Sequence, residues 1–409
     1  MNLSYFKTRE DAFSFLENYA FQKKTELDQK KLSDDLGLIK TYVLETSLNN
    51  SLQIDNNIFG DELSFHQVGD EDFYAFNHQG KLAGFLEFNT NRYILLHSFL
   101  HTKTIDKIIK NSVHNSSDLD NLWLSSDYYD CLWKNLIIPE WPDRFVKIKF
   151  EFENKFEVNG ENGYFEGDQE IDFEEEASDD LAKPIDYERG ASTTSITDRV
   201  KKMMVYLPEI QKYHPAFKTY KMLRIPSSAR GGYEVWSWGK YTYRANSFLD
   251  GRVKLIYLNN VYARSTKIIE EALWFNIEKT NIKDSEGFKL TGAPFVLKFH
   301  KPLADTTFEN LMNTTFDNNK GPLRLWGKPI RVSDYKYHIY GIDLHLWQKI
   351  FLEISREKIL AILPKGTCGN SIHRLITNIK SYIDPEAEVF IADKGYSSIL
   401  EKAFVNNDN

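Results

Sequence analysis

A stretch rich in cations and aromatic rings occupies residues 199–264 and has the composition most suggestive of ligand chemistry. It holds 13 Lys and Arg residues against three acidic ones. Proteins that bind single-stranded nucleic acid combine such residues, because cations neutralise phosphates while ring faces stack on bases. The sequence therefore predicts a non-catalytic nucleic-acid-binding or complex-organising protein that uses this stretch and prefers single strands to duplex.

The best candidates for contact lie around a hairpin expected at residues 231–244. In an extended strand Trp236, Trp238 and Lys240 share one face, which places two rings beside a cation. The alternative is that the Trp face belongs to the core, because Glu234 on the same face repels phosphate. The residues predicted to bind nucleic acid are Arg230, Trp236, Trp238, Lys240 and Arg244.

A second candidate site is the loop at residues 364–371, which joins an apolar strand to a helix. Backbone N–H groups at a helix start bind anions, and the same position favours a reactive thiolate at Cys368. An alternative function is therefore a cysteine-dependent or phosphate-handling enzyme around Cys368. The anion-binding candidates are Lys365, Gly366, Gly369 and Asn370. The candidates for catalysis are Cys368, His345, Asp343 and His373.

Other functions receive weaker support from the sequence. Aromatic and arginine-rich surfaces also bind proteins, so a protein–protein interaction scaffold within a larger complex is a third alternative. A hairpin with Asp72 and Glu87 resembles that of restriction-type nucleases, but the neutral Asn89 stands where a Lys should supply positive charge. Residues 337–345 hold two His and one Asp, too few carboxylates for a hard cation. We predict no metal and no cofactor, and whether the chain is an enzyme stays open.

Charge is distributed unevenly along the 409 residues. The net charge is −6 for residues 1–150, −12 for residues 151–190 and +10 for residues 191–409. Length and charge together predict two units with a solvated acidic connection between them. The mixture of expected helices and strands places both units in the α+β class. The expected parts are a mixed N-terminal α+β domain at 1–158, an acidic flexible linker at 159–194 and a larger, basic, aromatic-rich C-terminal α+β domain at 195–409.

Local patterns predict the elements that must position these residues. Thr8 followed by Asp11 indicates a helix start, and residues 144–158 alternate between apolar and charged, as in a half-buried strand. The N-terminal domain should also contain a second helix at 27–46, a hairpin at 73–88 and a strand at 93–99. The C-terminal domain should contain helices at 196–207, 252–280 and 371–383 and strands at 323–332, 337–342, 349–354, 359–363 and 389–392.

The two cysteines, Cys131 and Cys368, cannot form a disulfide framework, which favours a reducing compartment. The N-terminus lacks the apolar core of a signal peptide, and no stretch approaches 18 uninterrupted apolar residues. We therefore expect a cytoplasmic protein with no membrane partner. Cys131 lies among apolar neighbours in an expected helix and should be a buried thiol.

Overall fold

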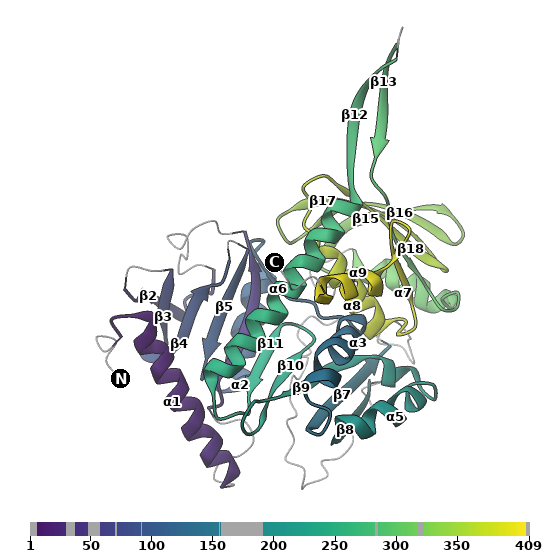
Figure 1. Ribbon diagram of the computed structural model, residues 1–409. Helices are drawn as coiled ribbons and strands as arrows, with labels where there is room; N and C mark the ends of the chain where they lie inside the picture. The colour runs from purple at the N-terminus through teal and green to yellow at the C-terminus, as the bar shows by residue number, and fades with distance from the viewer. Residues whose placement is uncertain are drawn as a thin grey trace.

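The chain forms two β-sheets with helices packed on them (Figure 1). The computed structural model describes residues 6–29, 37–47, 58–69, 72–90, 92–154, 156, 191–282, 285–316 and 323–405. The described strands pair antiparallel except for one parallel pair, so the expected α+β class with two units is confirmed. Most of the expected acidic linker lies outside the described residues.

The first sheet draws its strands from both sides of the acidic segment. In spatial order they are β2 (Leu63–Gln67), β3 (Phe73–His78), β4 (Lys81–Phe88), β5 (Tyr93–Ser98), β1 (Lys40–Thr46), β11 (Lys240–Tyr243), β10 (Gly232–Trp236), β9 (Tyr220–Pro226), β7 (Phe145–Glu153) and β8 (Ala191–Arg199). A further short strand, β6 (Leu119–Asn121), pairs with β1. The expected boundaries at 158 and 195 therefore do not separate the units, because strands on both sides of them share hydrogen bonds in one sheet.

Helices cover both faces of the first sheet. The helices α1 (Arg9–Asp28) and α6 (Phe248–Leu273) share one apolar core with it, and α2 (Thr102–Asn115) shares another. Every residue of β1 is consequently buried. The prediction of a helix at 27–46 was wrong for β1, because a strand covered on both faces lacks the alternation of polar and apolar residues that marks a strand with one exposed face.

The second sheet is built from the last part of the chain. In spatial order its strands are β15 (Leu325–Ser333), β16 (Lys336–Asp343), β17 (Gln348–Ser355), β18 (Lys358–Pro364), β14 (Phe295–Lys298), β19 (Glu388–Ile391) and β20 (Lys394–Gly395), with β12 (Trp274–Ile282) parallel to β18 and paired to β13 (Ser285–Thr291). The helix α8 (Asn370–Tyr382) shares the apolar core with the side of this sheet that carries Ile350 and Leu352. Figure 1 shows α6 extending from the first sheet toward the second.

Shorter elements complete the described fold. They are α3 (Ser126–Leu132), a π-helical turn at Trp133–Ile137, α4 (Ile138–Glu140), α5 (Val200–Ile210), a 3₁₀ turn at Pro215–Lys218, α7 (Asp305–Thr315) and α9 (Tyr396–Val405). None of the helices in the described ranges has both the length and the apolar character needed to span a bilayer.

Most of the expected elements are confirmed. The Oγ1 of Thr8 accepts from the backbone N of Asp11 at 3.2 Å, so the predicted helix start is correct. The hairpins at 73–88 and 231–244 and the strands β7 and β15 to β18 also lie where expected. Two helices differ in extent: residues 196–199 belong to β8, and α6 ends at Leu273 because the chain there enters β12.

A buried ion pair joins β11 to α2. The Nζ of Lys240 lies 2.8 Å from Oδ2 of Asp106, and both side chains are almost fully buried. The hydroxyl of Tyr42 donates to the same carboxylate. Each charge compensates the other in a water-poor interior, so removal of one partner leaves the other uncompensated.

We predict that Asp106→Asn lowers the free energy of unfolding by about 3–5 kcal/mol, since Lys240 is left buried without a countercharge. Adding Lys240→Met to that variant should recover part of the loss. Urea denaturation of both variants measures these changes. The control is Asp143→Asn, which breaks an exposed ion pair with Lys201 and should change the stability little. Equal effects of the two single substitutions would contradict the assignment.

Candidate functional site

The predicted nucleic-acid contacts of β10 and β11 lie largely inside the protein. The Nζ of Lys240 lies 5.3 Å and 5.5 Å from the ring centroids of Trp236 and Trp238, so the cation and both rings do gather on one face. That face packs against α2, however, because Trp238 belongs to the second core and Lys240 is paired with Asp106. The geometry matches the alternative in which the Trp face is core.

The remaining predicted contacts of this stretch are two arginines. Arg244 is ion-paired with the buried Glu234, which also receives Arg224. Among the five predicted contacts Arg230 alone is exposed. The hairpin therefore supplies packing and ion pairs to the first sheet and offers no exposed ring beside a cation.

The loop at 364–371 uses its backbone donors within the protein. The N–H of Gly369 donates to Oε1 of Glu270 at 2.8 Å, and the N–H of Cys368 donates to Gln348. The side-chain amide of Asn370 donates to Asp120 and to a backbone carbonyl. Lys365 and Gly366 are exposed. The position expected for a bound anion is therefore occupied by a carboxylate of the protein itself, that of Glu270.

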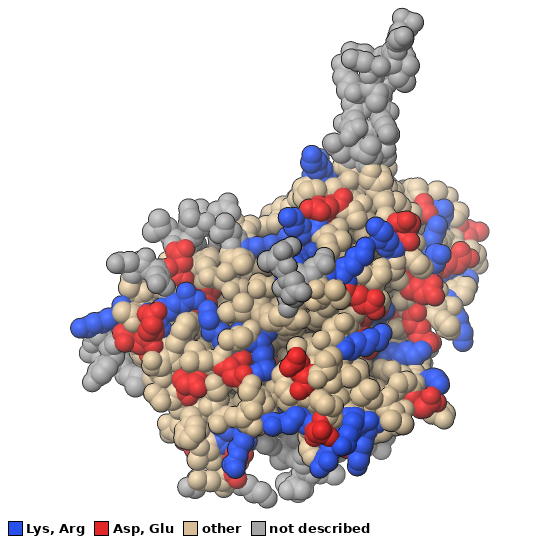
Figure 2. Space-filling view, viewed as in Figure 1, with Lys and Arg blue, Asp and Glu red and all other residues tan. Residues whose placement is uncertain are grey.

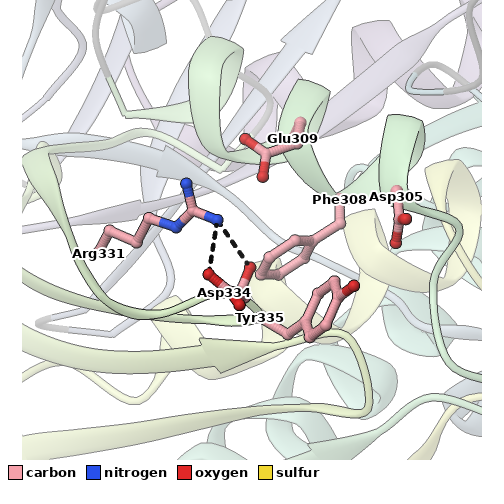
Figure 3. A pocket seen from close by; sticks show the side chains of 6 residues that line it. All are labelled: Asp305, Phe308, Glu309, Arg331, Asp334 and Tyr335. Carbon is pink, nitrogen blue, oxygen red and sulfur yellow. Dashed lines mark hydrogen bonds and ion pairs between the residues drawn. The ribbon is translucent and has the colours of Figure 1, made fainter.

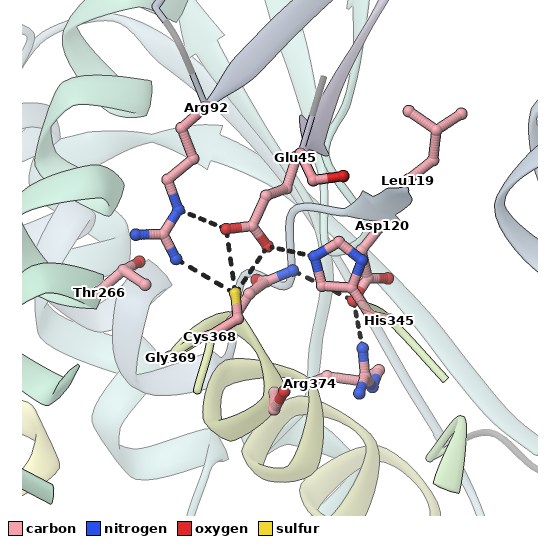
Figure 4. Close-up of polar contacts among 12 residues, drawn as sticks. Glu45, Arg92, Leu119, Asp120, Thr266, His345, Cys368, Gly369 and Arg374 are labelled. Carbon is pink, nitrogen blue, oxygen red and sulfur yellow. Dashed lines mark hydrogen bonds and ion pairs between the residues drawn. The ribbon is translucent and has the colours of Figure 1, made fainter. Parts of the chain in front are cut away.

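Cys368 lies in a buried polar cluster between the two sheets (Figure 4). Its Sγ is 3.2 Å from Oε1 and 3.3 Å from Oε2 of Glu45, and 3.2 Å from Nη2 of Arg92. Arg92 also binds the Glu45 carboxylate and Glu270. The Nε2 of His345 lies 3.3 Å from Oε2 of Glu45. Two residues predicted for catalysis, Cys368 and His345, thus meet at a carboxylate from β1.

The electrostatics of the cluster oppose a thiolate nucleophile. Burial raises the pKa of the Cys368 thiol well above its ordinary value, and the Glu45 carboxylate raises it further. Burial opposes the charge of Glu45, but Arg92 and His345 outweigh it and hold the pKa of this carboxyl below its usual range. Burial lowers the pKa of His345, yet Glu45 and the aspartates nearby produce a net rise. An unassisted Cys368 is therefore a neutral thiol at neutral pH.

The other two catalytic candidates serve different partners. Asp343 binds Arg374, the hydroxyl of Ser371 and the backbone N–H of His345. His373 has Nδ1 at 2.7 Å from the hydroxyl of Tyr396 and Nε2 at 3.1 Å from Oγ1 of Thr266. Burial lowers the pKa of His373 to about 3.

The residues of the cluster that were not predicted from the sequence are Glu45, Arg92, Asp120, Glu270, Arg324 and Arg374. Arg374 is fully buried and bridges Asp120 with Asp343, while Arg324 adds a second cation to Asp120. These groups come from strands, helices and loops that are far apart in the chain. One local signal was present, since Glu45 stands in a short run of strand-forming residues, but it did not indicate burial.

Cys131 behaves as predicted. It lies in α3 and is buried. Burial raises the pKa of its thiol to about 12, and nearby acidic residues add to that rise. Both cysteines of the chain are therefore buried thiols with no disulfide.

A different surface carries exposed aromatic rings and lysines. The outer face of the second sheet, defined as the side of β15, β16 and β17 opposite the one that shares the core with α8, pairs Lys328 with Tyr340 and Tyr340 with Phe351 across strands. The rings of Tyr340 and Phe351 lie 5.0 Å apart between centroids. The exposed side chains of this face are Trp326, Lys328, Ile330, Val332, Tyr340 and Lys349.

Charge on the outer face is positive in sum. Its cations are Lys328, Lys336 and Lys349, and its single carboxylate is Glu353. Both Lys336 and His338 lie within ion-pair distance of Glu353. Elsewhere charges of both signs are intermingled, as on the side of the molecule seen in Figure 2.

A cleft of about 240 Å³ lies at the turn between β15 and β16, beside α7 (Figure 3). Its lining residues are Asp305, Phe308, Glu309, Arg331, Asp334 and Tyr335. The guanidinium of Arg331 is 3.2 Å from Oδ1 of Asp334. Its one cation is thus already paired among three carboxylates, so the cleft is poorly suited to an anionic ligand.

A family model described as MJECL33-like protein matches residues 1–397, which include both sheets and the Cys368 cluster. The chain belongs to the MJECL33-like family. It is similar to the uncharacterized protein MJECL33 of Methanocaldococcus jannaschii, with 24% identity over 413 residues that cover 92% of each chain. No solved structure matches the chain. Membership of the MJECL33-like family thus extends over the whole two-sheet architecture but names no activity.

The burial of His373 allows a prediction of how the stability of this MJECL33-like family member depends on pH. An unfolded chain protonates His near pH 6.5, whereas the folded protein does so only near pH 3, so the unfolded state binds more protons between these values. Stability from this group is therefore complete above pH 6.5 and is lost as the pH falls. We expect the free energy of unfolding of the wild type to fall more steeply than that of His373→Gln, by up to about 1.4 kcal/mol per pH unit.

Urea denaturation from pH 4.5 to 7 measures the two slopes. His300→Gln is the matched control, because His300 is exposed and its replacement leaves the buried His373 in place. Identical slopes for the wild type and His373→Gln would show that His373 titrates normally in the folded protein.

Proposed function

We propose that this protein is a non-catalytic binder of single-stranded nucleic acid, and that the outer face of the second sheet holds the strand. The proposal rests on one observation: exposed aromatic rings alternate with lysines on the outer face of this sheet. Tyr340 is 72% exposed and Trp326 53% exposed, and Lys328 lies directly opposite Tyr340. Ring faces stack on bases while lysines neutralise the neighbouring phosphates.

Cross-strand geometry supports contact with more than one nucleotide. Trp326 is opposite Ile342, and Ile342 is opposite Lys349. This row is next to the row that contains Lys328, Tyr340 and Phe351, because side chains on one face of a strand recur every two residues. Each exposed ring of the face consequently has an exposed lysine in its own row.

The same face limits repulsion of phosphate. The Nζ of Lys336 lies 3.2 Å from Oε1 of Glu353, and Nε2 of His338 lies 3.1 Å from Oε2. The single carboxylate of the outer face is therefore already compensated, which favours the approach of phosphate to Lys328 and Lys349. Beyond the end of the face, Trp347 in the turn between β16 and β17 is 62% exposed and offers a further ring.

A protein partner is the alternative occupant, and the notion of a complex-organising protein would follow from it. Ile330 and Val332 are exposed on the same face and would suit an apolar interface. The pairing of each exposed ring with a lysine favours nucleic acid instead. Enzymatic use of Cys368 has less support, since its thiol is buried beside a carboxylate. Two reduced, separate thiols fit a cytoplasmic location.

We predict that Tyr340→Ala weakens binding of a single-stranded oligonucleotide by roughly 1–3 kcal/mol, the usual contribution of one stacked base. The salt dependence of binding should stay unchanged, because stacking releases no counterions. Replacing Lys328 by Glu should weaken binding and also flatten the plot of log K against log salt by about 0.7 per lost phosphate contact. Filter-binding isotherms at several salt concentrations measure both effects.

Tyr213→Ala is the matched control, since Tyr213 is 83% exposed in the loop after α5, outside the second sheet. It should bind as the wild type does. Thermal melts of all variants check that each is folded. The proposal fails if the wild type binds no oligonucleotide at about 50 mM salt, where phosphate attraction is strong, or if Tyr213→Ala and Tyr340→Ala lose affinity equally. Retention of a protein but no nucleic acid by the outer face would favour the partner alternative.

A further inference from the structure

We infer that Glu45, His345 and Cys368 form a binding site for a transition-metal ion of the Zn²⁺ class. One carboxylate oxygen, one imidazole nitrogen and one sulfur from these residues all lie within 4.8 Å of one another. Thiolate, imidazole and carboxylate are the ligands that Zn²⁺ takes in proteins. The inference concerns a region distinct from the outer face and does not depend on the proposed function.

The hydrogen bonds of His345 determine which ring nitrogen is available. Its Nδ1 lies 3.0 Å from the backbone carbonyl oxygen of Ser117. A carbonyl can only accept, so Nδ1 carries the proton and, in the neutral ring, Nε2 carries the lone pair. Metal-binding histidines almost always donate their other N–H in this way, which fixes the ring.

The Nε2 of His345 has no hydrogen bond of its own among the described residues, although the side chain is completely buried. Its distance of 3.3 Å to Oε2 of Glu45 is short enough for an ion pair, but the alignment is not that of a hydrogen bond. Nε2 therefore has an electrostatic contact with Glu45 but no aligned hydrogen bond, and a buried polar atom that lacks one is costly. An ion held between Nε2, the carboxylate and the sulfur would supply that partner.

The spacing of the three ligand atoms suits a tetrahedral ion. With bonds of about 2.0–2.3 Å, ligands of tetrahedral zinc stand roughly 3.3–3.6 Å apart. Oε2 of Glu45 is 3.3 Å from Sγ of Cys368 and 3.3 Å from Nε2 of His345, and the sulfur and the imidazole nitrogen are no more than 4.8 Å apart. Small movements of these side chains would therefore suffice.

Rigid segments hold each of the three side chains. Glu45 lies in β1, whose neighbours β5 and β6 pair with it on either side. His345 is in the turn between β16 and β17, where Asp343 accepts its backbone N–H at 2.9 Å. Cys368 precedes α8. The ion would consequently link the first sheet to the second.

Charge balance also permits the ion. On binding, the Cys368 thiol releases its proton to solvent and the resulting thiolate forms the sulfur–metal bond, while a proton on Nε2 of His345 leaves in the same way and frees the nitrogen lone pair. Arg92 donates to Glu45 and lies 3.2 Å from the sulfur, so its positive charge remains beside both anionic ligands. The Arg92 side chain is 31% exposed and that of Glu45 2%. Of these two side chains, Arg92 is thus the one in contact with solvent.

Cobalt binding to the full-length protein tests the site. The chain is first freed of metals with a chelator and then titrated with Co²⁺, whose bond to a thiolate gives a near-ultraviolet charge-transfer band. We expect that band to saturate at one ion per chain and to disappear when Zn²⁺ displaces Co²⁺. The melting temperature should rise with metal concentration, because an ion that binds the folded state alone stabilises it.

Variants identify the ligands. Cys368→Ala should abolish the band, while Glu45→Gln and His345→Gln should weaken Co²⁺ binding by at least tenfold. Cys131→Ala is the matched control, since it removes the other buried thiol of the chain, and it should keep the band. Far-ultraviolet circular dichroism checks that each variant is folded.

Two results would overturn the inference. One is the absence of a charge-transfer band in the folded wild type after Co²⁺ addition. The other is a band that survives in Glu45→Gln and His345→Gln at wild-type affinity, which would place the ion elsewhere. Both results can be obtained even if Cys368→Ala does not fold, and neither bears on nucleic-acid binding by the outer face.

Discussion

The guanidinium of Arg374, buried between the carboxylates of Asp120 and Asp343, is the interaction on which the joining of the two sheets depends. Asp120 belongs to β6 of the first sheet, Asp343 ends β16 of the second, and Arg374 lies in α8. Burial opposes the charge on Arg374, yet the two aspartates raise its pKa above the ordinary value. Loss of any of the three would leave a charge uncompensated in the interior, at a cost of roughly 3–5 kcal/mol.

The placement of the Cys368 cluster follows from the ion pairs of Arg374 with Asp120 and Asp343. Glu45 is the cross-strand partner of Asp120, so fixing Asp120 also fixes Glu45. Asp343 is two residues before His345 and accepts its backbone N–H. Arg374 is in the first turns of α8, and this helix begins two residues after Cys368. Three side chains from distant parts of the chain are therefore brought together by the same ion pairs that hold the sheets, whether or not an ion is present.

Local patterns in the sequence were enough to predict much of the second sheet, but not the buried ion pairs of Arg374 that connect the two sheets. Strands β17 and β18 alternate between buried and partly exposed residues along most of their length, so the period of two is visible in the residues themselves. Glu45 and Lys240 gave no comparable signal, because they are polar residues in strands covered on both faces. Their burial depends on partners, Arg92 and Asp106, that lie tens of residues or more away in the chain.

Two strand pairs of the chain are rich in aromatic and basic residues, and the sequence alone did not show which of them is exposed. Residues 231–244 and 326–349 both combine rings with cations. Composition favoured the first pair because it lies within residues 199–264, which hold 13 Lys and Arg residues against three acidic ones. In the folded chain α2 covers the first pair, whereas α8 shares a core with the inner face of the second. Antiparallel sheets with one face in water usually place polar residues there. Trp326, Ile330 and Tyr340 are exposed at such positions, and clustered exposed apolar groups are typical of binding surfaces. Coverage by helices, more than composition, therefore determines which of the two strand pairs can contact a ligand.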